Sequence, residues 1–351
     1  MRRKIYQELL QWKQRNGESA LLVQGARRVG KSYIVEAFAK AEYKSYILID
    51  FNLVDQQVKE MFEHDLVDLK TFFIKLATYY GVKLYERESL IIFDEVQLFP
   101  RARSAIKYLV ADGRYDYIET GSLISIRENV KDILIPSEED HVDMYPLDFE
   151  EFLWANGNDT MMDFIRDCYR KKAPLGQALH RKAMDLFRQY LIVGGMPQAV
   201  NAFVKHNDFD EVDRVKRRIL NLYRDEIRKH AKGYEIKVEA IYDEIPSQMK
   251  NQNQHFKLSS LKQGARFDEY KDAMFWLSDA MIVNHCYNAT EPTFGLNLNR
   301  DRTLLKCYMG DTGLLISHAF DENGIVADEV YKKLLLDKLE VNVGMVMENM
   351  V

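Results

Sequence analysis

Apolar positions along the first part of the chain predict strands and helices in alternation. Short apolar runs predict five buried strands, near residues 19–24, 45–51, 89–93, 115–119 and 141–147. Helical spacing of apolar residues is found before and between these runs, at 4–15, 34–39, 56–80 and 100–112. Strands that alternate with helices indicate a parallel sheet with helices on both faces, so we predict an α/β fold for this part.

The pattern turns helical in the second part of the chain. Helical segments are expected at 148–190 and 209–229, with a turn at 194–197, followed by a small module over 234–318. Two pieces late in this module have the pattern of a hairpin, at 281–287 and 303–309. Residues 331–351 keep helical spacing to the last residue without a cap, which predicts a helix cut within a C-terminal domain; a fraying terminal helix is the alternative.

The composition is that of an ordinary globular protein. The chain has 351 residues, 47% hydrophobic and 29% charged, which predicts two or three domains. Its three cysteines (Cys168, Cys286 and Cys307) are widely spaced, which favours a reducing cytoplasm and disfavours disulfides or a zinc site. Apolar runs are far shorter than a membrane span, and the basic start lacks the apolar core of a signal peptide. A net charge of −5 gives no general attraction to nucleic acid.

The first strand run leads directly into the motif G-x-x-x-x-G-K-S at residues 25–32. This is the phosphate-binding loop of nucleoside triphosphatases, in the order strand, glycine loop and helix. Its glycines let backbone N–H groups turn toward the phosphates, Lys31 reaches the β- and γ-phosphates, and the Ser32 hydroxyl binds Mg²⁺. We therefore expect ATP and Mg²⁺ as ligands, bound by the loop and the residue after it: Gly25, Ala26, Arg27, Arg28, Val29, Gly30, Lys31, Ser32 and Tyr33.

Two carboxylates, Asp94 and Glu95, directly follow the third strand run, at the sheet edge where open parallel sheets bind ligands. We expect Asp94 to hold Mg²⁺ through its water shell and Glu95 to polarise the attacking water; acids that only cap a helix are the alternative. The separation from Lys31 leaves room for one intervening strand. That separation is typical of NTPases with a catalytic glutamate, in which another strand lies between the loop strand and the acid strand. Gln97, close after the acids, either helps to position water or begins the next turn.

The fourth strand run ends in hydroxyl side chains, Thr120 and Ser122, with Gly121 between them. One of the two hydroxyls is expected to bind the γ-phosphate or to position the water. A turn that caps the next helix is the alternative, and the two interpretations are compatible. The catalytic residues that we predict are Glu95, Lys31 and Thr120, and the metal ligands are Ser32 and Asp94.

Together with later motifs, these segments resemble AAA-superfamily ATPases of the group often labelled archaeal-type ATPases. The resemblance rests on the segments 25–32, 93–101, 120–122, 145–153, 194–197 and 308–315. It implies a P-loop ATPase core followed by a helical lid, a winged-helix-like module and a restriction-endonuclease-like domain. The boundaries expected from it are 1–147, 148–232, 233–320 and, for the start of the last domain, 321–351. Residues 342–349 look like the opening helix of that last domain, whose metal-binding carboxylates would lie beyond Val351.

Two arginines, Arg101 and Arg224, are candidates for a finger that stabilises transition-state charge in a neighbouring subunit. Surface ion pairs are the alternative, and Arg224 has Asp225 and Glu226 beside it. If the module is a winged helix, its recognition helix lies near 266–276. That helix contains three acids, and DNA phosphates attract positive charge, so DNA binding is possible but not favoured over a protein partner or self-association.

The sequence thus predicts a cytoplasmic ATPase, without membrane contact, that couples Mg²⁺-dependent ATP binding and hydrolysis to conformational change. Two alternatives stay open. One is a nucleotide-gated switch or scaffold with negligible turnover, and the other is an ATPase that regulates a DNA-acting, nuclease-like C-terminal domain.

Overall fold

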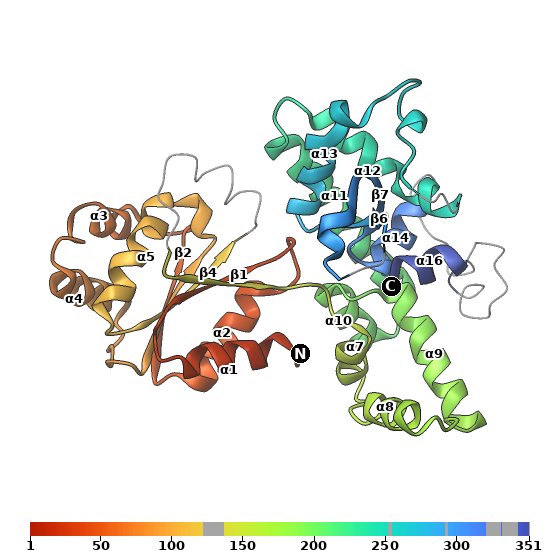
Figure 1. Ribbon diagram of the computed structural model, residues 1–351. Coiled ribbons are helices and arrows are strands. Elements are labelled where there is room, and N and C mark those ends of the chain that lie inside the picture. Colours follow the sequence, from red (N-terminus) through yellow and green to blue (C-terminus); the bar gives the residue numbers. More distant parts are fainter. Residues whose placement is uncertain (122–136, 252–254, 292–293, 321–330, 332–342, 351) are drawn as a thin grey trace. The chain divides into compact units, whose positions relative to one another are not determined.

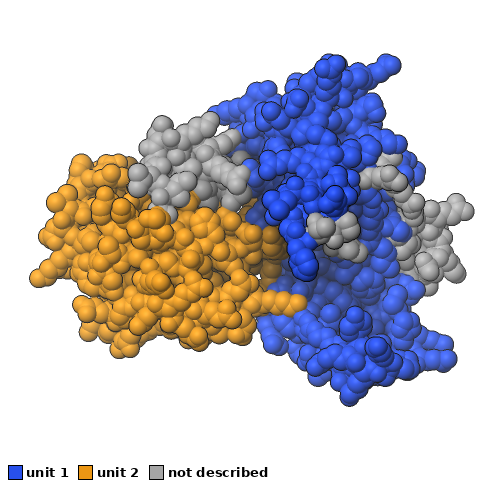
Figure 2. Space-filling model, in the orientation of Figure 1, with its two compact units in different colours: residues 1–2, 146–351 blue, residues 3–145 orange. Residues whose placement is uncertain are grey.

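The computed structural model describes residues 1–121, 137–251, 255–291, 294–320, 331 and 343–350. The chain divides into two compact units, coloured orange and blue in Figure 2. Residues 3–145 form the first, here called the N-terminal unit, and residues 1–2 with 146–351 form the second, the C-terminal unit. Among the described residues, no helix is both long and apolar enough to cross a membrane.

The N-terminal unit is a five-stranded parallel sheet with helices on both faces (Figure 1). Its strands are β1 (Ala20–Gln24), β2 (Ser45–Asp50), β3 (Ser89–Asp94), β4 (Asp116–Gly121) and β5 (Glu139–Asp143). Its helices are α1 (Ile5–Gln14), α2 (Lys31–Glu42), α3 (Gln56–His64), α4 (Leu69–Tyr80), the 3₁₀ turn η1 (Val96–Leu98) and α5 (Pro100–Asp112). The strand order is β2-β3-β4-β1-β5, which confirms the predicted α/β core and the strand between the loop strand and the acid strand.

Two helical layers hold this sheet from either side (Figure 1). On one face, α3, α4 and α5 pack on the strands through an apolar core, in which Phe62 meets Phe72 and Phe93 edge to face, with ring centroids 5.0 and 5.6 Å apart. Helices α1 and α2 lie on the other face. The rings of Tyr6 and Phe38 pack edge to face between them, with centroids 5.4 Å apart. Each such buried side chain stabilises the fold by about 2 kcal/mol, so the strand ends are rigid supports for a site.

The fifth strand begins and ends earlier than the sequence pattern predicted. β5 covers Glu139–Asp143 and not 141–147, because these residues pair in parallel with β1 from Ala20 to Gln24. Beyond the strand, Met144 N still donates to Gln24 O (2.7 Å). Pro146 has no N–H group that could donate a hydrogen bond to a neighbouring strand. Pro146 and Leu147, the last two residues of the predicted strand, belong to the C-terminal unit.

The C-terminal unit is mostly helical, as its sequence pattern predicted (Figure 1). Its larger helices are α7 (Phe149–Ala155), α8 (Met161–Lys171), α9 (Gln177–Val193), α10 (Pro197–His206), α11 (Phe209–His230), α12 (Glu235–Lys250), α13 (Phe267–Asp279), α14 (Thr312–Ala319) and α16 (Val343–Met350). Short 3₁₀ turns lie at η2 (Leu258–Ser260) and η3 (Leu296–Asn299). The expected hairpin is formed by β6 (Val283–Ala289) and β7 (Arg300–Met309), which pair antiparallel from Val283↔Met309.

Three of the later motifs meet at one junction within the C-terminal unit. Leu147 N donates to Gly195 O across 2.7 Å, and Gly195 N donates to Asp311 Oδ2 across 2.5 Å. A Cβ on Gly195 would lie 1.9 Å from Leu147 O, and one on Gly194 would lie 2.3 Å from Asp311 Oδ1. The glycines are therefore required by close approach of backbone and carboxylate, which gives these motifs a structural role.

Candidate active site

The glycine motif forms a loop between β1 and α2 in the N-terminal unit. Gly30 has the left-handed conformation (φ 96°, ψ 26°) and directly precedes the first residue of α2. A Cβ on Gly25 would lie 2.3 Å from Met144 O, so a larger residue would push the loop away from the edge of the sheet. Gly30 is therefore needed for its left-handed backbone conformation, and Gly25 for the close approach of Met144 O to the loop.

Side chains of the loop divide into buried anchors and exposed residues. Ala26 and Val29 are buried in the N-terminal unit. Arg27 and Arg28 are exposed, as is Tyr33 in the first turn of α2. The apolar pair therefore fixes the loop to the core, while the arginines and the tyrosine lie where a bound molecule or a neighbouring surface can reach them.

Arg3 supports the loop from outside the motif. Its side chain is buried, and it donates through Nη1 to Val29 O (3.0 Å) and through Nη2 to Tyr145 O (2.6 Å). A charged donor makes these bonds stronger than those between neutral groups. Sequence reasoning missed Arg3, because its partners are backbone carbonyls 26 and 142 positions away, which leave no pattern in the sequence.

Lys31 is enclosed by the loop. It is only 7% exposed, and its Nζ donates to Gly25 O at 2.9 Å and to Ala26 O at 3.0 Å. The ammonium group therefore lies at the N-terminus of α2, where the helix dipole and the backbone N–H groups already favour an anion. A phosphate bound here would replace the neutral carbonyl acceptors of Lys31 with negatively charged oxygens.

The loop, the acid strand and the strand between them meet at one carboxylate oxygen. Asp94 Oδ1 accepts a hydrogen bond from Ser32 Oγ across 2.7 Å and another from Thr120 Oγ1. This contact follows from the strand order, because β4 lies between β1 and β3 and the carboxyl ends of all three lie at the same edge. The structure thus brings together three of the residues that the motifs singled out.

Glu95 has an unusual backbone conformation directly after β3. Its φ of 53° and ψ of 46° lie in the left-handed region, which non-glycine residues rarely adopt. Its N–H donates to Thr120 Oγ1 across 3.4 Å, and its Oε2 accepts from Gln97 Nε2 across 2.5 Å. Strained backbone is concentrated at functional sites, so this observation strengthens the candidacy of Glu95.

The oxygen ligands at this edge fit a magnesium ion. A hydroxyl (Ser32) and a carboxylate (Asp94) lie in contact, and both are hard ligands of the kind that Mg²⁺ prefers. Elsewhere in the described part of the chain, no group of three or more His, Cys, Asp or Glu could hold a metal ion. Mg²⁺ usually takes one or two protein ligands and completes its shell with water and phosphate oxygens, which this site allows.

Two other candidates lie away from these contacts or outside the described residues. Ser122, the second hydroxyl of the Thr-Gly-Ser motif, falls outside the described residues. Arg101 lies in the first turn of α5, and its Nε donates to Phe62 O of α3 across 3.4 Å. In the described part of the unit, Arg101 thus contacts α3 and not the carboxylates of the site.

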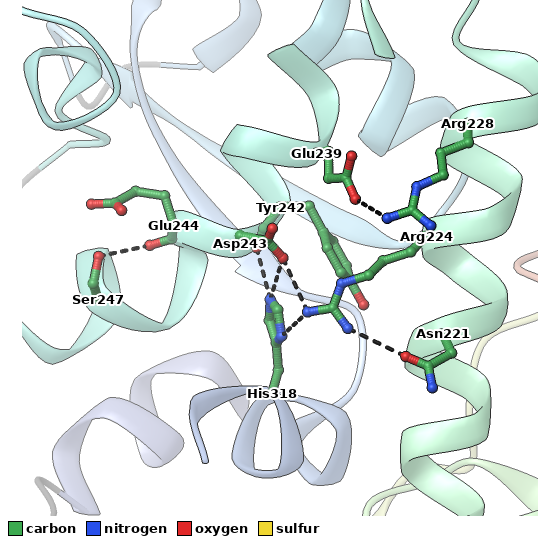
Figure 3. Close-up of polar contacts among 9 residues, drawn as sticks. All are labelled: Asn221, Arg224, Arg228, Glu239, Tyr242, Asp243, Glu244, Ser247 and His318. Atoms are coloured by element: carbon green, nitrogen blue, oxygen red, sulfur yellow. Dashed lines mark hydrogen bonds and ion pairs between the residues drawn. The ribbon is translucent and has the colours of Figure 1, made fainter. Parts of the chain in front are cut away.

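Arg224 belongs to a polar cluster that joins three helices of the C-terminal unit (Figure 3). Its guanidinium reaches from α11 to Asp243 Oδ1 of α12 at 3.1 Å and to His318 Nδ1 of α14 at 3.5 Å. His318 in turn stacks on Tyr242, with ring centroids 4.6 Å apart. The Arg224 Nη1 also donates to Asn221 Oδ1 of the same helix at 3.5 Å, whereas Asp225 lies 4.0 Å from Arg228. These contacts give Arg224 a structural role within its own unit.

The proposed recognition helix corresponds to α13, which carries exposed acids. Asp268, Glu269 and Asp272 are exposed, and Lys271 is the basic residue among them. Exposed acids on this helix are unfavourable for contact with DNA phosphates, and the preference for a protein partner stays a prediction.

Most of the segment 321–342 lies outside the described residues, whereas α16 is described. Its Asn349 pairs with the backbone of Met309, accepting from N at 2.7 Å and donating to O at 3.0 Å. Its Glu348 forms an ion pair with Lys306. Helix α16 therefore packs on β7 of the hairpin.

A cluster of charged residues, buried except for the exposed His141, lies beside the site and was not predicted. Arg103 of α5 donates through Nη2 to Glu139 of β5 at 2.9 and 3.2 Å, and His141 Nε2 lies 2.9 Å from Glu139 Oε1. Glu119 is fully buried, and desolvation together with the charge of Glu139 raises its pKa well above the usual value. An acid next to Thr120 in an otherwise apolar strand was the signal in the sequence that pointed to it.

Two family models match parts of the chain. Residues 17–153 match the family model described as "AAA domain", and residues 184–323 match one described as "Domain of unknown function". No curated protein matches the chain.

Several solved structures are similar to this chain over most of its length. The Walker-type ATPase PABY2304 of Pyrococcus abyssi has 14% identity and a TM-score of 0.51, with 90% of this chain and 95% of that chain covered. The Aeropyrum pernix Orc1 protein in complex with DNA has 11% identity and a TM-score of 0.32, covering 93% and 94%. The Thermotoga maritima RuvB Holliday junction branch migration motor has 11% identity and a TM-score of 0.35, covering 81% and 89%. The first of these supports a shared α/β fold, in agreement with the match of residues 17–153 to the AAA domain model.

Proposed function

We propose that the chain binds ATP with Mg²⁺ and hydrolyses it by in-line attack of water on the γ-phosphate. The observation that carries this proposal is the hydrogen bonding of Asp94, whose Oδ1 accepts from Ser32 Oγ at 2.7 Å and from Thr120 Oγ1. A glycine loop alone would account for phosphate binding. The carboxylates next to it supply what hydrolysis needs in addition, namely a metal ligand and a group that orients water.

Lys31 and the loop N–H groups bind the β- and γ-phosphates in this proposal. Lys31 Nζ lies 2.9 and 3.0 Å from two loop carbonyls, so a small movement would bring it to a phosphate. Hydrogen bonds between charged partners are roughly twice as strong as those between neutral groups, which favours the exchange. The remaining loop residues from Gly25 to Tyr33 surround the nucleotide.

The carboxylates take separate roles. Ser32 and Asp94 hold Mg²⁺, which neutralises charge on the phosphate oxygens. Glu95 orients and polarises the attacking water, and Thr120 binds the water or the γ-phosphate. A positioned base typically accelerates a reaction by about 10²-fold to 10⁴-fold, so most of the turnover depends on Glu95.

We extend the proposal to the rest of the chain through its resemblance to archaeal-type ATPases. Residues 148–232 act as a helical lid, 233–320 as a winged-helix-like module, and 321–351 begin a further domain. The nucleotide state changes the conformation of these parts or their binding to a partner in the cytoplasm. A protein partner or a second copy is favoured over DNA, because the exposed face of α13 is acidic.

Steady-state phosphate release with MgATP tests the proposal. The wild type is expected to turn over, and Glu95→Gln to retain ATP while releasing phosphate at least about 100-fold more slowly. Lys31→Ala is expected to lose nucleotide affinity. The matched control is Glu18→Gln, an exposed glutamate before β1, which should behave as the wild type.

Two outcomes would overturn the proposal. If the wild type and Glu95→Gln bind ATP but share the same negligible rate, the chain is a nucleotide-gated switch and not a hydrolase. If Lys31→Ala keeps its affinity for ATP, the nucleotide binds elsewhere.

A further inference from the structure

We propose that Gln97 is a positioning residue, which holds the carboxylate of Glu95 in the orientation required to activate water. The inference rests on the proposed function, because it concerns the same site and the same reaction. It assigns to Gln97 a role that acts through Glu95 and not through contact with the nucleotide.

The amide of Gln97 is itself held in place. Gln97 is only 5% exposed and lies in the 3₁₀ turn η1, which directly follows Glu95. This turn is closed by hydrogen bonds from Leu98 N to Glu95 O (3.0 Å) and from Phe99 N to Val96 O (3.1 Å). Val96, within the same turn, is fully buried in the core. A buried side chain on a closed turn is a fixed donor.

Glu95 needs such a donor, because its backbone is fixed but its side chain is long. The left-handed conformation (φ 53°, ψ 46°) and the bond from Glu95 N to Thr120 Oγ1 determine where the side chain begins. A glutamate then has three side-chain torsions, and the half-buried Glu95 has room to use them. The 2.5 Å hydrogen bond from Gln97 Nε2 to Oε2 restricts these torsions.

The chemistry of an amide donor suits this task. A lysine or arginine at this position would form an ion pair with Glu95 and neutralise its charge. The neutral amide of Gln97 leaves the negative charge of the carboxylate uncompensated. The bond engages Oε2. Among the described residues, none donates a hydrogen bond to Oε1, the oxygen that would face the water. One oxygen is thus used for orientation and the other for the reaction.

Two substitutions at Gln97 test the inference. Gln97→Met keeps the length of the side chain and removes the donor, and Gln97→Asn keeps the amide but shortens its reach by one methylene. Misplacing a catalytic group by about 1 Å can cost about 100-fold in rate. We expect both variants to lower kcat by about 10-fold to 100-fold, with KM and ATP affinity within about twofold of the wild type. Gln7→Met, on the exposed face of α1, is the control.

A double substitution separates positioning from a general structural effect. If Gln97 acts through Glu95, then Gln97→Met has no further effect on kcat once Glu95→Gln is present. A structural role would lower the rate in both backgrounds and would also lower the melting temperature. Gln97→Asn, which retains a polar side chain in the buried turn, keeps the test valid if Gln97→Met does not fold.

The outcomes distinguish the inference from the proposed function. An active wild type, an inactive Glu95→Gln and an unchanged kcat in Gln97→Met and Gln97→Asn would overturn the inference alone. A rise of kcat in Gln97→Met would overturn it too, since Gln97 would then restrain Glu95 from reacting. If the wild type releases no phosphate, the proposed function fails and the inference fails with it.

Discussion

The hydroxyl of Ser32 donates a hydrogen bond to Asp94 Oδ1 across 2.7 Å, although 62 residues separate the two in the chain. Ser32 lies in the first turn of α2, and Asp94 is the last residue of β3. They meet because parallel strands bring their carboxyl ends to one edge of the sheet. This pair is the point at which a cation would link the loop to the acid strand.

Asp94→Asn should therefore impair turnover more than nucleotide binding. The substitution keeps the size of the side chain and removes its charge. We expect kcat to fall about 100-fold or more, because electrostatic stabilisation is usually the largest single contribution to catalysis. The half-saturating Mg²⁺ concentration should rise, as measured by phosphate release over a Mg²⁺ titration. Asp163→Asn, exposed on α8, is the control, and an equal loss in both variants would contradict the assignment.

Gly195→Ala should strongly destabilise the C-terminal unit. The new Cβ would lie 1.9 Å from Leu147 O, and backbone on both sides leaves little room to relax. We expect a loss of about 3 kcal/mol or more in the free energy of unfolding, measured by urea denaturation. Gly81→Ala is the comparison, because a Cβ there meets open space and only the positive φ of +63° costs about 1 kcal/mol. Equal losses would show that close approach at Gly195 is unimportant.

The fold of the N-terminal unit followed from the sequence because its signals are local. Apolar runs predicted β1 to β4, and the helix predicted over 100–112 is α5, which ends before Gly113 with its φ of 75°. The phosphate loop, Asp94 and Thr120 could be placed at one edge because strand ends in a parallel sheet converge. β5 begins two residues and ends four residues before the predicted strand, since its limits depend on pairing with β1 and not on its own apolar pattern.

Contacts across long sequence distances could not be predicted in the same way. Arg3 donates hydrogen bonds to two backbone carbonyls. Every residue has such a carbonyl, so the sequence does not mark these partners. For Arg224, ion pairs with carboxylates near it in the sequence were the alternative to a finger, whereas in the structure it reaches Asp243 of α12 and His318 of α14. The junction of Gly195 with Asp311 joins a backbone N–H to a carboxylate 116 positions away. Such pairs become visible only when the helices are packed.

His141 should make the N-terminal unit less stable as pH rises. Its Nε2 lies 2.9 Å from Glu139 Oε1, and the hydrogen bond to this carboxylate raises the pKa of His141 above 6.5. The protonated form is favoured in the folded state, so its contribution is complete below pH 6.5 and is lost as pH rises through the raised pKa. We expect the melting temperature to fall over this range, and to fall less in His141→Gln. His64→Gln, an exposed control, should keep the slope of the wild type.

Lys216 should have the opposite effect in the C-terminal unit at higher pH. It is fully buried, donates to Ile192 O (2.7 Å) and Tyr331 Oη (3.2 Å), and burial lowers its pKa from 10.5 to about 8. Between these two values the unfolded chain binds a proton that the folded chain does not, so stability rises with pH. Urea unfolding at about pH 8 and about pH 10 should show this rise in the wild type and not in Lys216→Met. The same slope in both proteins would exclude Lys216 as its source.

At position 95, with its left-handed backbone, stability and catalysis favour different residues. Stability alone would favour glycine there, because a side chain at φ 53° costs about 1 kcal/mol that glycine avoids. Glu95→Gly should thus yield a protein that melts at a higher temperature and releases no phosphate. A chain that has given up catalysis in the course of evolution would be free to relax at this position. The residue at position 95 could therefore be read, in related sequences, as a record of whether hydrolysis has been kept.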